Sequence, residues 1–136
     1  MDSNAIRQVM RERRRSLSVQ QQSNASIELA KQLSILPAFC NSNRIAFYLA
    51  NDGEIDPSIA MGIAEAAGKE CYLPILHPLK QSRLYFARYR SGDKLSINRF
   101  GIEEPTLKSA NIVPPLGLDL ILLPLVAFDY RGNRLG

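Results

Sequence analysis

The stretch Arg44-Ile-Ala-Phe-Tyr-Leu-Ala50 decides the fold, because it is a nearly continuous apolar run of strand length. Such runs are typical of a β-strand that is covered on both faces. Asn51-Asp52-Gly53 then turns the chain, and Asp56-Pro57 supplies an N-cap and a first-turn proline for a helix that ends at Gly68. Cys71-Tyr-Leu-Pro-Ile-Leu76 indicates the next buried strand. The order strand, helix, strand predicts a protein of the α/β class.

Two helices are predicted ahead of this unit. Ser3 can cap the first helix, which carries apolar residues at helical spacing. Ser18 and Gln21 form a capping box that begins the second helix. We expect the inner face of the second helix to carry three apolar residues, Ile27, Ala30 and Leu33. These helices belong to the layers of an α/β domain.

The pattern changes after the second strand. Leu84 to Arg90 predicts a strand followed by a turn, with residues 94–97 as a shorter partner strand. Residues 101–105 and 113–115 are expected to be irregular, and Asp119 to Leu123 returns as a buried strand. The chain therefore predicts a three-layer, Rossmann-like α/β domain with a mostly parallel sheet and an antiparallel excursion.

Length and composition bound the class of protein. At 136 residues the chain is expected to form one domain that spans residues 1–136. A content of 46% hydrophobic and 22% charged residues is typical of a soluble globular protein. No apolar run approaches the roughly 20 residues that span a bilayer, and no secretory signal is recognisable. Cys40 and Cys71 lie far apart and are expected to be reduced thiols, which indicates a cytoplasmic protein.

Most of the net charge of +4 lies in residues 1–18, which contain five arginines and two acidic residues. Arg7, Arg11 and Arg15 recur every four residues and therefore lie on one side of the predicted helix. Three guanidinium groups in a row can bind a triphosphate through forked hydrogen bonds. The same stripe can also be a solvated helix face or a contact for nucleic acid. Nucleic acid is disfavoured because no aromatic residues alternate with the arginines.

Polar residues follow two of the predicted strands, where the ligands of α/β proteins gather. Glu54 can hold an amine- or amide-bearing ring there, and the alternative is a solvated loop residue. Asp129 and Arg134, with nearby glycines, resemble the opening of an anion site. His77 precedes a proline and is expected to be structural rather than a general base. No pattern indicates a protein nucleophile, a zinc site, a phosphate loop or a dinucleotide fingerprint, which argues against covalent catalysis and zinc chemistry.

Five segments in a fixed order carry a resemblance to a known family. They are the arginine-rich first helix, Phe47 to Asp56, Tyr72-Leu-Pro74, Gly101 to Pro105, and Asp119 to Gly136. Together they resemble the 5-formyltetrahydrofolate cyclo-ligase family, whose members are also called methenyltetrahydrofolate synthetases. The resemblance covers essentially the whole chain, and its last segment is the most specific.

The resemblance implies an ATP-dependent enzyme that converts 5-formyltetrahydrofolate to 5,10-methenyltetrahydrofolate, with Mg²⁺ as cofactor and with release of ADP and phosphate. It implies ATP contacts at Arg7, Arg11, Arg15, Arg134, Leu135 and Gly136. It also implies folate contacts at Leu49 and Glu54. No catalytic side chain is assigned, because phosphoryl transfer depends on positioning and charge neutralisation more than on a protein nucleophile. Nucleic acid and membrane are not expected partners, and the magnesium ligands and the oligomeric state stay open.

The chain departs from the family pattern at two places. Ser3 lies near the position of a family lysine, so a phosphate ligand is lost there unless another arginine replaces it. The family continues beyond Gly136 into a glycine-rich Tyr-Tyr-Asp or Phe-Tyr-Asp segment, so we expect a domain whose C-terminal part is missing and whose activity is absent or impaired. The alternative is a non-catalytic folate- or nucleotide-binding protein of the same fold. A sugar-phosphate isomerase or transferase is disfavoured because no acid/base pair is recognisable. The cyclo-ligase assignment requires arginines from both chain ends to converge around a phosphate tail.

Overall fold

A five-stranded sheet forms the centre of the computed structural model, which describes residues 2–76, 83–106 and 111–136. In spatial order its strands are β6 (Ile112–Val113), β3 (Leu84–Arg88), β2 (Glu70–Leu76), β1 (Arg44–Ala46) and β7 (Leu120–Ile121). β1 pairs in parallel with β2 and β7, whereas β3 is antiparallel to both of its neighbours. Four of the five strands therefore run in one direction. The expected α/β class, with a mostly parallel sheet and an antiparallel excursion, is confirmed.

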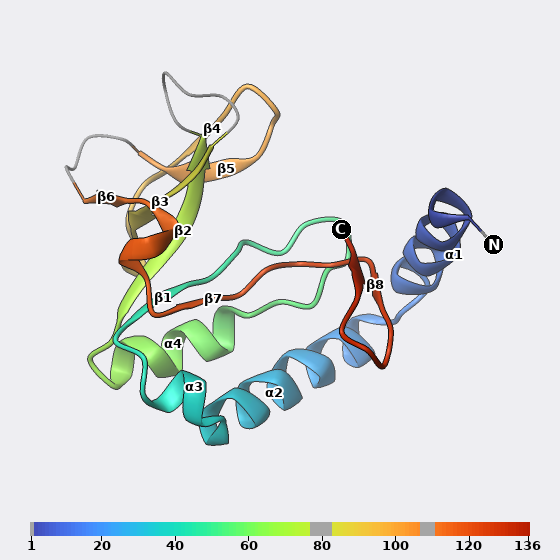
Figure 1. Ribbon diagram of the computed structural model, residues 1–136, viewed down its shortest axis with the longest axis horizontal. Coiled ribbons are helices and arrows are strands. Elements are labelled where there is room, and N and C mark those ends of the chain that lie inside the picture. The colour runs from blue at the N-terminus through green and yellow to red at the C-terminus, as the bar shows by residue number, and fades with distance from the viewer. Residues whose placement is uncertain (1, 77–82, 107–110) are drawn as a thin grey trace.

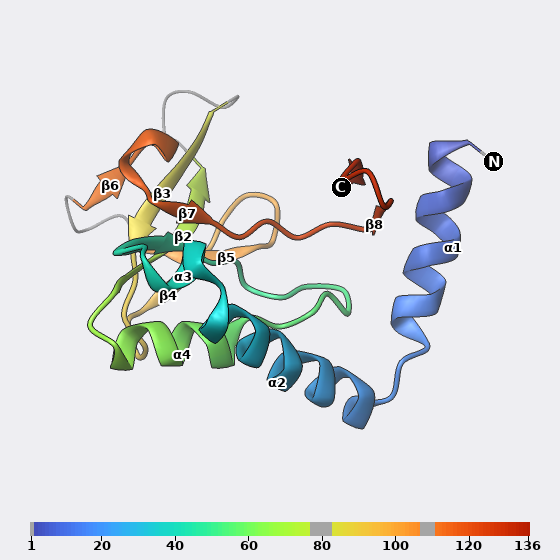
Figure 2. The ribbon, with the colours of Figure 1, turned by 60° about the horizontal axis from the view of Figure 1, so that its bottom comes forward.

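Helices cover one face of this sheet. α2 (Val19–Ile35) and α4 (Ser58–Ala66) lie side by side beneath it, and the short α3 (Pro37–Cys40) follows α2 (Figures 1 and 2). Because successive strand residues face opposite sides, Ile45 points to the helices and Ala46 to the other face. The helix-covered core includes Leu33, Phe39, Ile45, Phe47 and Leu73. In the described residues the other face carries a smaller cluster around Tyr72 and Phe86, and the 3₁₀ turn η1 (Pro115–Gly117) contacts β3.

Capping side chains explain where the first two helices begin. Ser3 was the expected cap of α1 (Ser3–Arg15), and this is wrong: the carboxylate of Asp2 accepts from the backbone N–H of Ala5 at 2.7 Å. Asp at this position satisfies an N–H that has no partner within the helix. The capping box of Ser18 and Gln21 on α2 is confirmed by reciprocal hydrogen bonds of 3.1 and 2.8 Å.

The inner face of α2 differs from the expectation at one position. Ala30 and Leu33 are buried as expected, but Ile27 is 42% exposed and Ser26 is buried instead. Ser26, Ala30 and Leu33 are spaced by four and three residues, so they share a side, whereas Ile27 lies about 100° further around the helix. Helical register, rather than the hydrophobicity of one residue, therefore decides which side chains are buried.

The segment after β3 differs most from the sequence-based expectation. Residues 95–97 form β4 (Leu95–Ile97), which pairs not with β3 but with β5 (Glu103–Pro105), a strand within the segment that was expected to be irregular. Glu104 is buried in β5, and its carboxylate accepts from the N–H of Leu76 at 3.0 Å and from Asn98 Nδ2 at 3.2 Å. A buried carboxylate needs such donors. The hydrophobic pattern of the sequence did not predict β5, because the buried residue at its centre is a hydrogen-bonded glutamate and not an apolar residue.

Three smaller boundaries also differ. β1 ends at Ala46, although burial continues to Tyr48, so the observed strand is shorter than the strand expected over residues 44–50. β7 is half-buried rather than buried, because it pairs with β1 on one side only in the described sheet. The segment at 113–115 is only partly irregular, since Ile112–Val113 forms β6.

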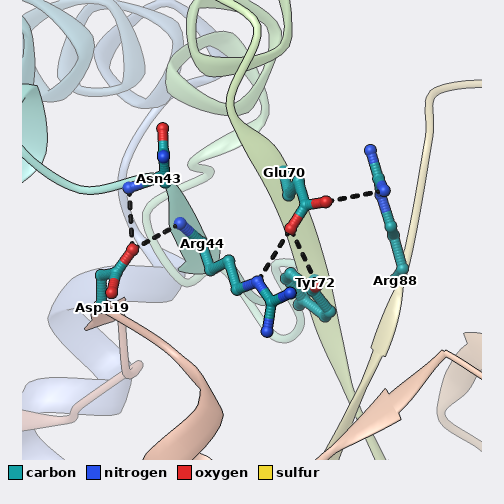
Figure 3. Close-up of polar contacts among 6 residues, drawn as sticks. All are labelled: Asn43, Arg44, Glu70, Tyr72, Arg88 and Asp119. Atoms are coloured by element: carbon teal, nitrogen blue, oxygen red, sulfur yellow. Dashed lines mark hydrogen bonds and ion pairs between the residues drawn. The ribbon is translucent and has the colours of Figure 1, made fainter.

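Charged residues meet at the amino ends of the parallel strands (Figure 3). Glu70 accepts from Arg44 Nε and Arg88 Nη1, each at 2.9 Å, and from the Tyr72 hydroxyl at 3.2 Å. Asp119 accepts from the N–H of Arg44 at 2.8 Å, and such backbone donors lower the pKa of the Asp119 carboxyl. These contacts join β1, β2, β3 and the start of β7 at the end of the sheet opposite to the loop of Glu54.

Helix α1 stands apart from the sheet and lies next to a hairpin of β8 (Ala127–Phe128) and β9 (Arg134–Leu135) (Figures 1 and 2). None of its residues is buried, although Ile6, Val9 and Met10 are partly covered. Both ends of the described chain therefore lie on the same side of the molecule. Among the described residues, no helix combines the length and the apolar character that a membrane crossing requires.

Candidate functional site

Two adjoining hollows open where the chain leaves β1 and β7, at the carboxyl ends of the parallel strands. This is the edge at which open α/β sheets bind ligands. One hollow has a volume of about 310 Å³, and its lining is mostly apolar and includes Leu49, Phe86 and Leu122 together with Glu54. The other has a volume of about 370 Å³ and reaches Leu29 on α2. Glu54 lines both hollows, and Glu103 also lines the smaller one, so carboxylates border a largely apolar space of ligand size.

Glu54 has a structural contact that the sequence did not reveal. Its Oε1 accepts from the N–H of Asn51 at 3.0 Å, and its own N–H donates to the carbonyl of Asn51 at 3.1 Å. Glu54 is therefore not simply a solvated loop residue, since its carboxylate closes the turn at residues 51–54. Its Oε2 has no protein partner among the described residues and remains free for a ligand.

Tyr48 stands beside Glu54 and strengthens the same loop. Its hydroxyl donates to the carbonyl of Ile55 at 2.7 Å. Burial raises the pKa of Tyr48 to about 12, with further contributions from the nearby carboxylates of Glu54 and Asp56. Tyr48 is therefore protonated at neutral pH and acts as a donor that fixes the loop.

The arginines of α1 separate into different environments. Arg7, Arg11 and Arg15 all border one groove on the helix surface, so the expected stripe is present. Arg7 Nε donates to the carbonyl of Gly136 at 3.3 Å, whereas Arg11 has no partner among the described residues. Arg15 uses Nε and one terminal nitrogen to grip both carboxylate oxygens of Asp52, each at 2.8 Å. The forked face of Arg15 is thus committed to a protein carboxylate.

The C-terminal hairpin brings a second cationic group to Gly136. Arg134 is exposed, and a Cβ atom placed on Gly136 would lie 3.5 Å from its Nη1. Because Arg7 hydrogen-bonds to Gly136 across a separation of 129 positions, guanidinium groups from both ends of the chain meet at this residue. Between α1 and the hairpin lies a hollow of about 260 Å³, lined by Ile6, Arg134 and Leu135 among others.

Asp129 builds the hairpin turn. Its carboxylate accepts from the N–H groups of Arg131 and Asn133 and from Asn133 Nδ2, at 2.9 to 3.0 Å. These bonds, the Asn133 side chain first, lower the pKa of Asp129. Gly132 follows with a φ of +85°, which a glycine adopts without strain. Asp129 therefore shapes the loop that presents Arg134, and its own oxygens are occupied.

The structure thus places most of the residues that were predicted to contact ligands in two groups. Leu49 and Glu54 share the first hollow, while Arg7, Arg11 and the segment Arg134–Gly136 gather around the N-terminal helix. Their roles as ligand contacts stay predictions. Asp52, which binds Arg15, was not among the predicted site residues. The sequence signal that could have found it is an Asp-Gly pair in a turn after a buried strand. His77 lies outside the described residues.

The described residues contain no group of three or more His, Cys, Asp or Glu side chains that could hold a metal ion. Of the two cysteines, Cys40 is exposed and Cys71 is buried, and both are free thiols, as expected. Burial raises the pKa of Cys71 to about 11, which keeps this thiol protonated.

Comparisons with known proteins point in a single direction. The sequence profile of the 5-formyltetrahydrofolate cyclo-ligase family matches residues 1–136. 5-Formyltetrahydrofolate cyclo-ligase of Escherichia coli is 37% identical over 128 residues, which cover 94% of this chain and 70% of the relative. The enzyme of the same name from Haemophilus influenzae is 37% identical over 131 residues, covering 96% and 70%. The solved structure of 5,10-methenyltetrahydrofolate synthetase from Aquifex aeolicus matches with a TM-score of 0.83 and 30% identity, covering 100% of this chain and 67% of the other.

Proposed function

The chain belongs to the 5-formyltetrahydrofolate cyclo-ligase family, and from this membership we propose that it joins the formyl group of 5-formyltetrahydrofolate to N10 in a reaction that consumes ATP. The products are 5,10-methenyltetrahydrofolate, ADP and phosphate. One observation carries the ATP part of this proposal: Arg7 and Arg134, from opposite ends of the chain, meet at Gly136. Converging guanidinium groups suit the oxygens of a phosphate tail.

The proposed reaction explains why ATP is needed. A formamide oxygen is a poor leaving group, so it must be activated before the ring can close. The formyl oxygen attacks the γ-phosphorus of ATP, and the bond from that phosphorus to the ADP oxygen breaks. N10 then attacks the formyl carbon and loses its proton, and the carbon–oxygen bond breaks to release phosphate. The product keeps the positive charge delocalised over N5, the carbon and N10.

The protein's part in this reaction is positioning and charge neutralisation. Arg11 and Arg134 have no partner among the described residues, so their donors are available to phosphate oxygens. Arg7 holds Gly136 through a long bond of 3.3 Å, which a phosphate oxygen can replace. Leu135 and Gly136 would add backbone contacts. Arg15 is the least suited of the proposed ATP contacts because Asp52 already occupies its fork.

The hollow lined by Leu49 and Glu54 is the proposed folate site. Its largely apolar wall suits the pterin and phenyl rings, while the free oxygen of Glu54 can accept from ring N–H or amino groups. The opening at the carboxyl ends of β1 and β7 lies on the same edge of the sheet as the loop that Asp52 connects to α1. This arrangement supports a formyl group and a phosphate tail that approach each other from neighbouring subsites.

Magnesium is proposed as part of the MgATP substrate. The residues of the described ranges do not fit a dedicated magnesium cage, because no three acidic or histidine side chains gather there. Mg²⁺ commonly keeps several waters and binds through substrate phosphates with only one or two carboxylates. The ion would therefore reach this site on the nucleotide.

Ligand binding and product formation test the proposal together. Calorimetry should detect binding of 5-formyltetrahydrofolate and of MgATP, and any absorbance of the methenyl product should appear only when ATP is present. Glu54→Gln keeps an acceptor oxygen for the N–H of Asn51 but removes the charge. We expect it to weaken folate binding by about tenfold, the difference between a charged and a neutral hydrogen bond, and to leave MgATP affinity unchanged.

Glu28→Gln, an equal charge change on the exposed face of α2, is the matched control and should behave like the wild type. Absence of 5-formyltetrahydrofolate binding to the wild-type chain would contradict the proposal. Binding of folate with no response to ATP would favour the non-catalytic binder. Equal loss of both ligands in Glu54→Gln would indicate a folding defect and not a substrate contact.

A further inference from the structure

Asp52 joins the base of α1 to the loop that follows β1. Its carboxylate grips Arg15 through two bonds of 2.8 Å and reaches Arg14 Nη2 at 3.3 Å. Both arginines belong to the last turn of α1, a helix with no buried residue. The side chain of Arg14 is nevertheless only 16% exposed, because it lies against Gly53. The clamp of Asp52 with Arg14 and Arg15 therefore holds the base of α1 against the loop that follows β1.

The backbone of this loop is shaped for the clamp. Asp52 has a φ of +50° and is the only non-glycine residue with a positive φ among residues 2–76, 83–106 and 111–136. Such a conformation costs free energy unless the surroundings fix it. Gly53 follows at +74°, and a Cβ atom there would lie 3.3 Å from Arg14 Cγ and 3.4 Å from Gln22 Nε2. The loop thus approaches α1 and α2 so closely that an added methyl group would have to displace the side chains of Arg14 and Gln22 slightly.

The same turn also fixes Glu54. Glu54 is bonded to Asn51 through both its backbone N–H and its carboxylate, so residues 51–54 form one closed unit. One side of this unit faces the arginines of α1 and the other side lines the two hollows at the sheet edge. Only Gly53 therefore lies between Glu54 and the residue that contacts the arginines of α1.

We propose that Asp52 is a positioning residue that couples the nucleotide subsite on α1 to the folate subsite at Glu54. The inference rests on the proposed function, because it takes Arg7 and Arg11 as phosphate contacts and Glu54 as a folate contact. Phosphate binding orders α1, the Asp52 clamp passes this order to the turn at 51–54, and Glu54 is held in its binding position. Each ligand then strengthens the binding of the other, and linkage requires the two effects to be equal. Arg15 acts in this scheme as the partner of Asp52.

Asp52→Asn is a sharp probe of this coupling. Asparagine tolerates a positive φ as aspartate does, so the turn keeps its backbone conformation. The variant removes the charge and one acceptor oxygen, which leaves Arg15 without its fork. Arg15→Lys is the second variant: it keeps the charge of the helix but cannot form the two parallel bonds. Glu28→Gln again serves as the control for loss of one exposed negative charge.

The measurement is the dissociation constant of 5-formyltetrahydrofolate with and without a saturating non-hydrolysable ATP analogue and Mg²⁺. For the wild type and Glu28→Gln we expect the analogue to tighten folate binding at least fivefold. For Asp52→Asn the ratio should fall to about one, while folate affinity without nucleotide changes less than about twofold. Arg15→Lys should lie between these limits. Hydrogen exchange of the α1 amides should be faster in Asp52→Asn than in the wild type, without a matching loss in the core strands.

The outcomes separate this inference from the proposed function. If the wild type binds both ligands but Asp52→Asn keeps the full ratio, Asp52 is not the coupling residue. If the wild type binds both ligands independently, no coupling exists and the inference fails while the proposed function stands. If the wild type binds neither ligand, the proposed function fails, and the inference fails with it. Faster α1 exchange with an unchanged ratio would leave Asp52 a purely structural residue.

Discussion

Replacing Gly53 by alanine tests whether α1 is held against the loop after β1. Gly53 has a φ of +74°, and the closest contacts of an added Cβ would be Arg14 Cγ at 3.3 Å and Gln22 Nε2 at 3.4 Å. Gly68 has nearly the same φ, +79°, but nothing lies within 4 Å of its added Cβ. The pair therefore separates backbone strain from contact with the helices.

The magnitudes follow from these contacts. A left-handed residue with a Cβ costs about 1–2 kcal/mol, offset by about 0.4–1 kcal/mol from the lower entropy of the unfolded chain. Gly68→Ala should thus lower the free energy of unfolding by roughly 1 kcal/mol. Gly53→Ala carries the same backbone strain together with the displacement of Arg14 and Gln22. Overpacking costs about 1–3 kcal/mol in cores, and we expect the lower end here because both contacted atoms belong to flexible side chains.

Urea unfolding followed by circular dichroism measures both variants, and hydrogen exchange measures α1 directly. Gly53→Ala should lose roughly 2 kcal/mol and show faster exchange of the α1 amides, whereas Gly68→Ala should lose about half as much with unchanged α1 exchange. Equal destabilisation of the two variants, together with unchanged α1 exchange in Gly53→Ala, would refute the close approach of the loop to α1.

Other expected outcomes concern the core, the thiols and acid stability. Phe47 is 1% exposed, and Phe47→Ala should lower the free energy of unfolding by about 3–5 kcal/mol. A decrease below about 1 kcal/mol in urea unfolding would place Phe47 outside the core. At pH 8 a thiol reagent should modify Cys40 in the folded protein and reach Cys71 only after unfolding, since burial raises the pKa of Cys71 to about 11; equal rates for the two thiols would contradict this. The side-chain hydrogen bond from Arg15 lowers the pKa of Asp52 from 3.8 to about 2, so the clamp's contribution is complete above pH 3.8 and is lost as the pH falls towards 2. The protection of the α1 amides against exchange, relative to their intrinsic rates at each pH, should fall over this window in the wild type, and the same fall in Asp52→Asn would exclude the clamp as its cause.

The sequence predicted those parts of the fold that depend on apolar periodicity. β1, β2 and α4 follow from buried runs and turn residues, and Ser18 with Gln21 marks the start of α2 by its own hydrogen bonds. β5 was missed because its central residue, Glu104, is buried through hydrogen bonds to Leu76 and Asn98, and no hydrophobic pattern signals such a residue. The pairing of β4 was missed for the same reason.

The sequence located part of the candidate site but did not reveal the long-range contact between Arg15 and Asp52. Glu54 follows a buried strand, so the rule that ligands bind at carboxyl ends of strands located it without any structure. Spacing placed Arg15 on the same side of the helix as Arg7 and Arg11, but it could not show that the loop of Asp52 folds back onto that turn. That contact joins residues 37 positions apart, and only the packed chain brings them together.

Glu70 distinguishes the correct alignment of three strands from a wrong one. If β1 slid along β2 by two residues, Ile45 and Ala46 would still face their proper sides, so hydrophobicity alone would tolerate the error. Arg44, however, would lose its carboxylate, and Glu70 would keep only Arg88 and the Tyr72 hydroxyl. The contacts of Glu70 thus fix the register of the strands at the end of the sheet that lies away from the hollows. Libraries that randomise residues 49–55 or 122–125 to accept new substrates should therefore keep the strand frame, provided that Glu70 is left intact.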